Sequence, residues 1–157
     1  MLEERESLAS NWVNSPSKNE AGFYALHYAA FHGNINMIRL LQQHGASFTA
    51  ITQQGINIMH VAAQGDCPLA LAYFRDHGLS VDSRDLKDNT PLHWAAFSGS
   101  DLAVSYLLAQ GSDIEARDWN GLTPLHAAVR QFFEHENLAV IKQLLLKGAD
   151  RNALDFD

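Results

Sequence analysis

Apolar residues along the chain recur in four similar blocks. Each block carries a neighbouring pair of apolar residues, and further apolar side chains follow one helical turn later. This spacing places the apolar side chains on one face of an amphipathic helix. The pairs are Met37-Ile38, Ala70-Leu71, Ala103-Val104 and Val140-Ile141. We predict that each pair lies on the inward face of the second helix of a helix pair.

The start of the first helix in each block is marked by a short phrase that ends in histidine. These phrases recur every 33 residues, at Tyr24-Ala25-Leu26-His27, Asn57-Ile58-Met59-His60, Thr90-Pro91-Leu92-His93 and Thr123-Pro124-Leu125-His126. The Thr90 hydroxyl can cap a helix start, and Pro91 fits the first helical position, where no backbone N–H is needed. Small alanines follow each histidine and allow successive helices to approach closely.

A glycine follows the second helix of each block, where a left-handed residue ends a helix at little steric cost. These glycines are Gly45, Gly78, Gly111 and Gly148. The fourth arrives four residues late, which indicates a four-residue insertion within 130–137. Asp66 stands where a glycine is expected after the first helix of the second block, so we predict a re-routed turn there.

The repeated phrase, the period of 33 residues and the Gly-Ala-Asp ending at 148–150 resemble the ankyrin repeat. A tetratricopeptide array would instead show a period of 34 and a different aromatic pattern. The resemblance covers residues 20–153 and implies an all-α solenoid of four repeats with short hairpin-like fingers. We place the repeats at about 20–51, 52–84, 85–117 and 118–153.

The ends of the chain depart from the repeat pattern. The first repeat lacks Thr-Pro, so we predict that residues 1–19 form an N-terminal cap. Leu8, Trp12 and Val13 would belong to a helix that covers the open end. Residues 154–157 form a tail at the point where another finger would begin.

Composition narrows the class of protein. The chain is 46% hydrophobic, which is too apolar for a disordered tail, and no run is long enough to span a membrane. A net charge of −7 disfavours nucleic acid and acidic membranes, since both are bound through clustered Lys and Arg. A single cysteine and no secretory signal favour a reducing compartment. We predict a cytoplasmic monomer with protein or peptide partners.

Histidine and cysteine residues do not form a catalytic or metal-binding pattern in the sequence. The four repeated histidines fall on successive helices about 8–10 Å apart, whereas zinc needs ligands at about 2.1 Å. We predict that their rings bond the backbone of neighbouring loops. Cys67 lies near a helix start beside Asp66, and we favour a partly buried filler over a reactive thiol. We predict no enzyme activity, cofactor or metal for this chain.

The repeated register places fingertips and first helices along one concave face, which we predict to be a protein-binding surface. Its large apolar groups and a nearby arginine are typical of binding hot spots. Trp94 and Trp119 have an alternative role in packing finger upon finger. The predicted binding residues are Phe31, Gln64, Leu86, Lys87, Asn89, Trp94, Phe97, Trp119, Asn120, Leu122 and Arg130.

A second hypothesis is that the array recruits substrates for a membrane enzyme. The stretches 55–66 and 89–100 resemble the ankyrin half of DHHC-type palmitoyltransferases, which binds short substrate segments on the cytosolic side of the membrane. That resemblance implies a binding role for Trp94. The chain contains no Asp-His-His-Cys motif, so it would be the recruiting fragment of such an enzyme. A structural spacer, the third hypothesis, would have polar, featureless fingers.

Overall fold

The computed structural model describes residues 13–18, 22–135 and 138–156. Regular structure in these residues is helical and forms four successive helix pairs, which confirms the predicted all-α solenoid. The first helices are α2 (Ala25–Phe31), α4 (Ile58–Gln64), α6 (Pro91–Ser98) and α8 (Pro124–His135). The second helices are α3 (Ile35–Gln43), α5 (Pro68–Asp76), α7 (Asp101–Ala109) and α9 (Leu138–Leu146).

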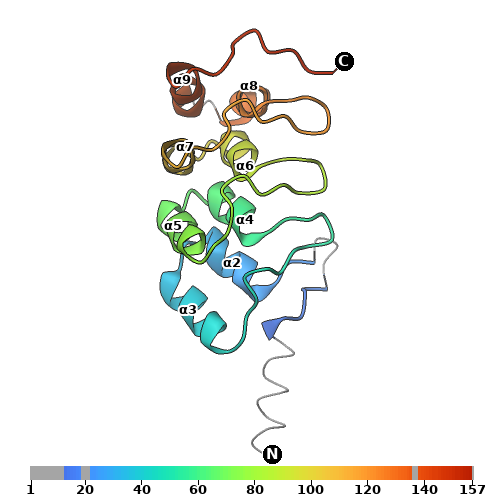
Figure 1. Ribbon diagram of the computed structural model, residues 1–157, viewed down its shortest axis with the longest axis vertical. Helices are drawn as coiled ribbons and strands as arrows, with labels where there is room; N and C mark the ends of the chain where they lie inside the picture. The colour runs from blue at the N-terminus through green and yellow to red at the C-terminus, as the bar shows by residue number, and fades with distance from the viewer. Residues whose placement is uncertain (1–12, 19–21, 136–137, 157) are drawn as a thin grey trace, which may run out of the picture.

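The helix pairs stack along the long axis of the molecule (Figure 1). The first helices form a central column in which α2 contacts α4, α4 contacts α6 and α6 contacts α8. The second helices form a column on one side, and the long loops extend as fingers on the other (Figure 1). Because the helices are short, their stability comes from this stacking and not from helix propensity.

The repeated histidine closes the N-terminus of each first helix. Its Nδ1 accepts a hydrogen bond from the backbone N–H three residues earlier, at 3.1–3.3 Å in all four repeats. The Nε2–H is then free to donate to the carbonyl of the next finger. His27 reaches Ile56 at 3.3 Å, His60 reaches Asn89 at 3.1 Å, and His93 reaches Leu122 at 3.0 Å. The predicted bonding of the ring to the backbone of the next finger is confirmed for these three histidines.

The core lies between the two columns of helices. Its largest repeated members are fully buried residues at the same position of successive first helices, namely Leu26, Met59 and Leu92. The predicted inward face of the second helices is confirmed for Ile38, Ala70-Leu71, Ala103-Val104 and Val140, and Ile141 is partly buried against the same core. Met37 was expected to be buried as well, but it is 44% exposed. Met37 belongs to the first helix pair. No earlier helix pair among the described residues covers it.

The turn after α4 keeps the route of the other turns, so the predicted re-routing is wrong. Asp66 adopts φ 55°, close to the φ 61° of Gly33 and the φ 71° of Gly99 at equivalent positions. Aspartate tolerates this left-handed conformation better than most residues. Its carboxylate Oδ1 also accepts a hydrogen bond of 2.7 Å from the N–H of Ala103, in the first turn of α7.

The insertion in the fourth repeat lengthens its first helix. Helix α8 has 12 residues, whereas α6 has 8. Four residues add about one helical turn. The added turn is at the C-terminal end of α8. Its start, at Pro124, therefore keeps the 33-residue spacing from Pro91 at the start of α6.

Both ends of the described chain continue contacts found between repeats. Val13 is buried, and the Asn14 side chain accepts from Ser47 N at 2.9 Å. The predicted Leu8 and Trp12 lie outside the described residues. In the tail, Phe156 N donates to Asn120 O at 2.9 Å, in the manner of neighbouring fingers.

A candidate protein-binding groove

In three of the fingers, one side chain at the base accepts hydrogen bonds from backbone N–H groups within the same finger. The Asp85 Oδ1 accepts hydrogen bonds from the N–H groups of Lys87 and Asn89 at 2.8 and 2.9 Å. Asp118 binds the N–H groups of Asn120 and Leu122 in the same way, at 2.9 and 2.8 Å. Thr52 fills this role in the preceding finger through its hydroxyl.

Neighbouring fingers are also bonded to one another. The N–H of Leu86 donates to Gln54 O at 2.9 Å, and the N–H of Trp119 donates to Lys87 O at 3.0 Å. Each finger is thus fixed both at its base and at its neighbour. The row of fingers forms one ordered edge of the array.

A hollow of about 630 Å³ lies between these fingers and the first helices of the second to fourth repeats, and we call it the main groove. The predicted binding residues that line it are Gln64, Lys87, Asn89, Trp94, Phe97, Trp119, Asn120, Leu122 and Arg130. The groove is also lined by Gln54 and Ile56, which the repeat pattern places on a finger, and by four residues that the prediction lacks, namely Asp85, His93, Asp118 and Ala127. The 33-residue spacing of Asp85 and Asp118 in the sequence was the signal for two of them.

Two predicted residues lie elsewhere. Leu86 is 73% exposed on its finger and does not line the main groove. Phe31 lines a separate hollow of about 330 Å³ between the first helices of the first two repeats, which we call the N-terminal hollow. Its other lining residues are Phe23, His27, Tyr28, His32, Val61 and Gln64.

Trp94 is half-buried, with its indole fixed by two contacts. Its Nε1–H donates to Oδ2 of Asp85 at 3.1 Å. Its ring meets the His60 imidazole edge-on, with centroids 6.0 Å apart. Trp119 differs, since its side chain is 61% exposed and only its backbone bonds the neighbouring finger. The main groove therefore combines one fixed tryptophan with one that stands largely in solvent.

Burial favours the neutral form of the two histidines below the groove. Burial lowers the pKa of His93, although its hydrogen bond to the Leu122 carbonyl acts in the opposite direction. Burial likewise lowers the pKa of His60. The charged side chains that line the groove are Asp85, Lys87, Asp118 and Arg130. Both charge signs and several carboxamides are available there to a polar ligand.

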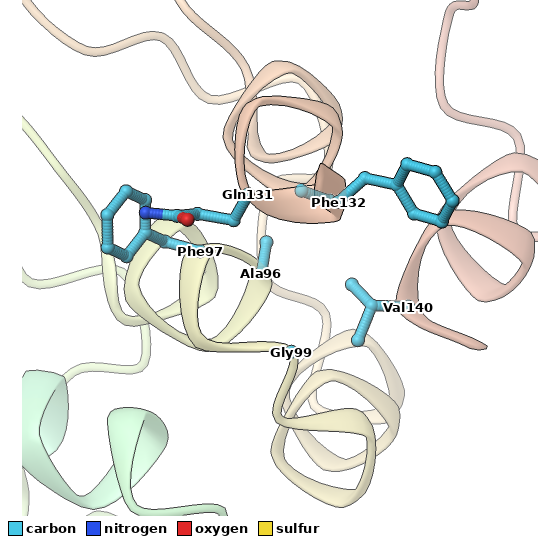
Figure 2. Close-up of a pocket in the computed structure, with 7 residues that line it drawn as sticks. Ala96, Phe97, Gly99, Gln131, Phe132 and Val140 are labelled. Atoms are coloured by element: carbon cyan, nitrogen blue, oxygen red, sulfur yellow. The ribbon is translucent and has the colours of Figure 1, made fainter. Parts of the chain in front are cut away.

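A third and much smaller cavity lies behind Phe97, between α6, α8 and α9. Figure 2 shows Gln131 beside Phe97, whereas Phe132 points away from both. The volume of about 10 Å³ is at the lower limit for one water molecule. We attribute it to packing around the lengthened α8 and not to a ligand site.

The described residues form neither a metal centre nor a membrane-spanning helix. Within residues 13–18, 22–135 and 138–156, no group of three or more His, Cys, Asp or Glu side chains could hold a metal ion. None of the helices in this part of the chain has the length and apolar character that a bilayer crossing requires. Burial and the neighbouring Asp66 raise the pKa of the Cys67 thiol, which lowers its reactivity.

Comparison with known proteins agrees with the helix pairs and their period. A family model described as ankyrin repeats in three copies matches residues 5–85 and again residues 58–155. The chain belongs to the ankyrin-repeat family. A search of curated proteins gave no match. Ankyrin repeats are generally protein–protein interaction modules and are typically not catalytic, so protein partners follow for this array. Nothing in the family match bears on the resemblance to palmitoyltransferases.

Proposed function

We propose that this ankyrin array binds an extended segment of a partner protein in the main groove, with Trp94 as the central contact. The proposal is supported above all by one observation, which is that the predicted tryptophan lies half-buried in a hollow large enough for several side chains. Its hydrogen bond to Asp85 fixes the ring before any ligand arrives. Preorganised groups cost less entropy on binding.

The surroundings of Trp94 support the same function. Phe97 and Trp119 offer exposed aromatic surface, which is enriched at the centres of protein interfaces. Asn120 and Gln64 add carboxamides that can bond the backbone of an extended segment. Because the fingers are tied to one another, the groove keeps its shape along several repeats.

Selection of peptides from a random phage-displayed library tests this function. The wild-type array is expected to enrich peptides whose affinity, measured by fluorescence anisotropy, falls at least about tenfold with Phe97→Ala plus Trp119→Ala. Both side chains are exposed, so truncation should leave the fold intact. Circular dichroism and thermal unfolding check this point.

A matched control removes exposed apolar groups from the opposite side of the array. Leu69 on α5 and Leu102 on α7 occupy equivalent positions and are 75% and 56% exposed. Leu69→Ala plus Leu102→Ala should leave peptide affinity unchanged. Equal affinity of the wild type and the folded groove variant would remove the main groove as the binding site.

Recruitment of substrates for palmitoylation is a second candidate function. The position of Trp94 favours it. The resemblance to the ankyrin half of DHHC-type palmitoyltransferases implies a binding role for the tryptophan of the Trp-Ala-Ala phrase, and Trp94 lines the main groove. Sequencing the transcript beyond the codon for Asp157 tests it. Hydrophobic spans and an Asp-His-His-Cys motif would support this candidate, and a stop codon or further repeats would contradict it.

A further inference from the structure

The position of Trp94 is occupied by side chains of alternating size along the array. The residues at this position, spaced by 33, are Tyr28, Val61, Trp94 and Ala127. The first and third repeats thus carry a large aromatic ring, and the second and fourth carry a small side chain. A large ring next to a small neighbour leaves space beside it.

The alternation coincides with the two hollows on the concave face. Tyr28 and Val61 line the N-terminal hollow, and Trp94 and Ala127 line the main groove. A second repeated position carries an aromatic ring in the same two repeats, with Phe31 at the N-terminal hollow and Phe97 at the main groove, whereas Gln64 and Arg130 occupy it in the other two. The same kind of cavity is therefore built twice, two repeats apart.

The two hollows are neighbours. Gln64 lines both of them, so an extended chain that crosses Gln64 along the first helices reaches both. Stacked helices lie about 8–10 Å apart, which separates equivalent points two repeats apart by about 16–20 Å. An extended chain rises about 3.3 Å per residue, so about five or six residues bridge this distance.

The chemistry of the hollows specifies what each accepts. Among the residues that the structure describes, the side chains that line the N-terminal hollow include no Asp, Glu, Lys or Arg, and Phe23, Tyr28 and Phe31 give it aromatic surface. This composition suits an uncharged, bulky apolar side chain. Trp94, Trp119 and Leu122 offer a similar apolar surface in the main groove, which is also lined by the charged side chains of Asp85, Lys87, Asp118 and Arg130.

We propose that the ligand is an extended segment with two bulky apolar side chains about five or six residues apart, one seated in each hollow. This inference rests on the proposed function, since it names the kind of segment that the groove takes. It adds a second anchoring site on the first repeat, where the ligand side chain contacts Tyr28, Phe31 and Val61. The two anchors together set the register of the bound chain.

Each hollow can be filled by a residue that the array already carries at the same position. Val61→Tyr copies the first repeat and fills the N-terminal hollow. Ala127→Trp copies the third repeat, and Asp118 stands at the finger base as Asp85 does beside Trp94. Leu69→Trp, on the opposite side, is the control for added bulk.

The test uses synthetic peptides that match sequences selected by the wild-type array. Val61→Tyr should weaken their binding at least about tenfold. Replacement by alanine of the peptide anchor that sits in the N-terminal hollow should weaken it to the same extent. The two changes should not add, because both remove the same contact. Leu69→Trp should have no effect. If Val61→Tyr fails to fold, the affinity of the wild-type array is measured for a series of peptides whose anchors lie about three to nine residues apart. The tightest binding is expected at a separation of about five or six residues.

The outcomes separate this inference from the proposed function. Selected peptides that need Phe97 and Trp119 but carry one anchor, and bind Val61→Tyr as well as the wild type, would overturn the two-anchor ligand alone. An affinity that does not depend on anchor spacing would do the same. If the wild-type array retains no peptide, both the groove function and this inference fail.

Discussion

Gly65 lies so close to Phe31 of the preceding repeat that the Phe31 carbonyl oxygen would be 1.9 Å from a Cβ atom on residue 65. Gly65 stands one position before the turn site that Gly33 and Gly99 occupy in other repeats, and contact with its neighbour requires a glycine there. Its φ of −78° is open to any residue, so the restriction comes from contact and not from backbone conformation.

Gly65→Ala should destabilise the array by about 1–3 kcal/mol, the usual cost of forcing extra volume into a packed site. The clashing atom belongs to the backbone, so it cannot move aside as a flexible side chain would. Urea unfolding followed by circular dichroism measures the change. Ser98→Ala, at the equivalent position of the third repeat, is the control and should be near neutral. A Gly65→Ala variant as stable as the wild type would contradict the contact.

Asp66 combines a left-handed backbone with a hydrogen bond to α7. Asp66→Gly removes the hydrogen bond that caps Ala103 N, which should lower the free energy of unfolding by about 0.5–2 kcal/mol. Glycine adopts the positive φ of this position without strain, which offsets part of that loss. Asp66→Ala loses the cap and adds strain at positive φ, of about 1–2 kcal/mol. Asp66→Ala should therefore unfold at a lower temperature than Asp66→Gly. Asp66→Asn, which keeps an acceptor, should unfold close to the wild type, and the reverse order would refute the role of the cap.

Asp85→Thr separates the two roles of the Asp85 carboxylate. Thr52 shows that threonine can accept the N–H groups within a finger, so the finger should persist. The bond to Trp94 Nε1 should be lost, because the shorter hydroxyl replaces the second carboxylate oxygen. Faster solvent exchange of the Trp94 indole N–H, followed by NMR, is the expected result. An unchanged exchange rate would show that Asp85 does not hold the ring.

Leu92→Ala should cost about 2–5 kcal/mol, because Leu92 is fully buried between neighbouring repeats. Leu125 occupies the equivalent position in the last repeat but is only partly buried. Leu125→Ala should therefore cost less. Chemical denaturation of both variants under the same conditions compares them, and equal losses would mean that the end of the array packs as tightly as its middle.

Acid should weaken the array through its buried histidines. Burial lowers the pKa of His27 to about 4, from an unfolded value of 6.5. The unfolded chain therefore binds more protons between these values, and stability that is complete above pH 6.5 is lost as the pH falls toward 4. His27 alone should account for about 2 kcal/mol between pH 7 and pH 5.

The pH effect is measured as the free energy of unfolding in urea at several pH values. His27→Gln should flatten the dependence, whereas Leu69→Ala, at an exposed position without a titratable group, should leave it unchanged. His60 and His93 have pKa values lowered in the same direction and should retain part of the slope. A stability that is constant from pH 7 to pH 5 would contradict a neutral, buried imidazole.

Most of the architecture could be predicted from the sequence. The period of 33 residues fixed the number of repeats, and Thr90 with Pro91 located a helix start. The roles of the histidines followed from the same register. These features depend on spacing and local capping, which are properties of the chain before it folds.

Other features could not be predicted because they depend on how closely one repeat lies against the next. The contacts of Asp66 with Ala103, and of Gly65 with Phe31, join residues more than thirty positions apart. The sequence shows neither the distance nor the direction of such contacts. A misplaced glycine and an unexpected aspartate therefore looked like defects in the pattern.

The sequence by itself determined that helix pairs repeat and which side of them carries aromatic residues. Only the tertiary structure decided that Trp94 is held by Asp85 while Trp119 stands in solvent, and that Phe31 belongs to a separate hollow. The physical reason is that periodicity assigns a residue to a face, whereas its burial and partners depend on the side chains that the neighbouring repeats place around it.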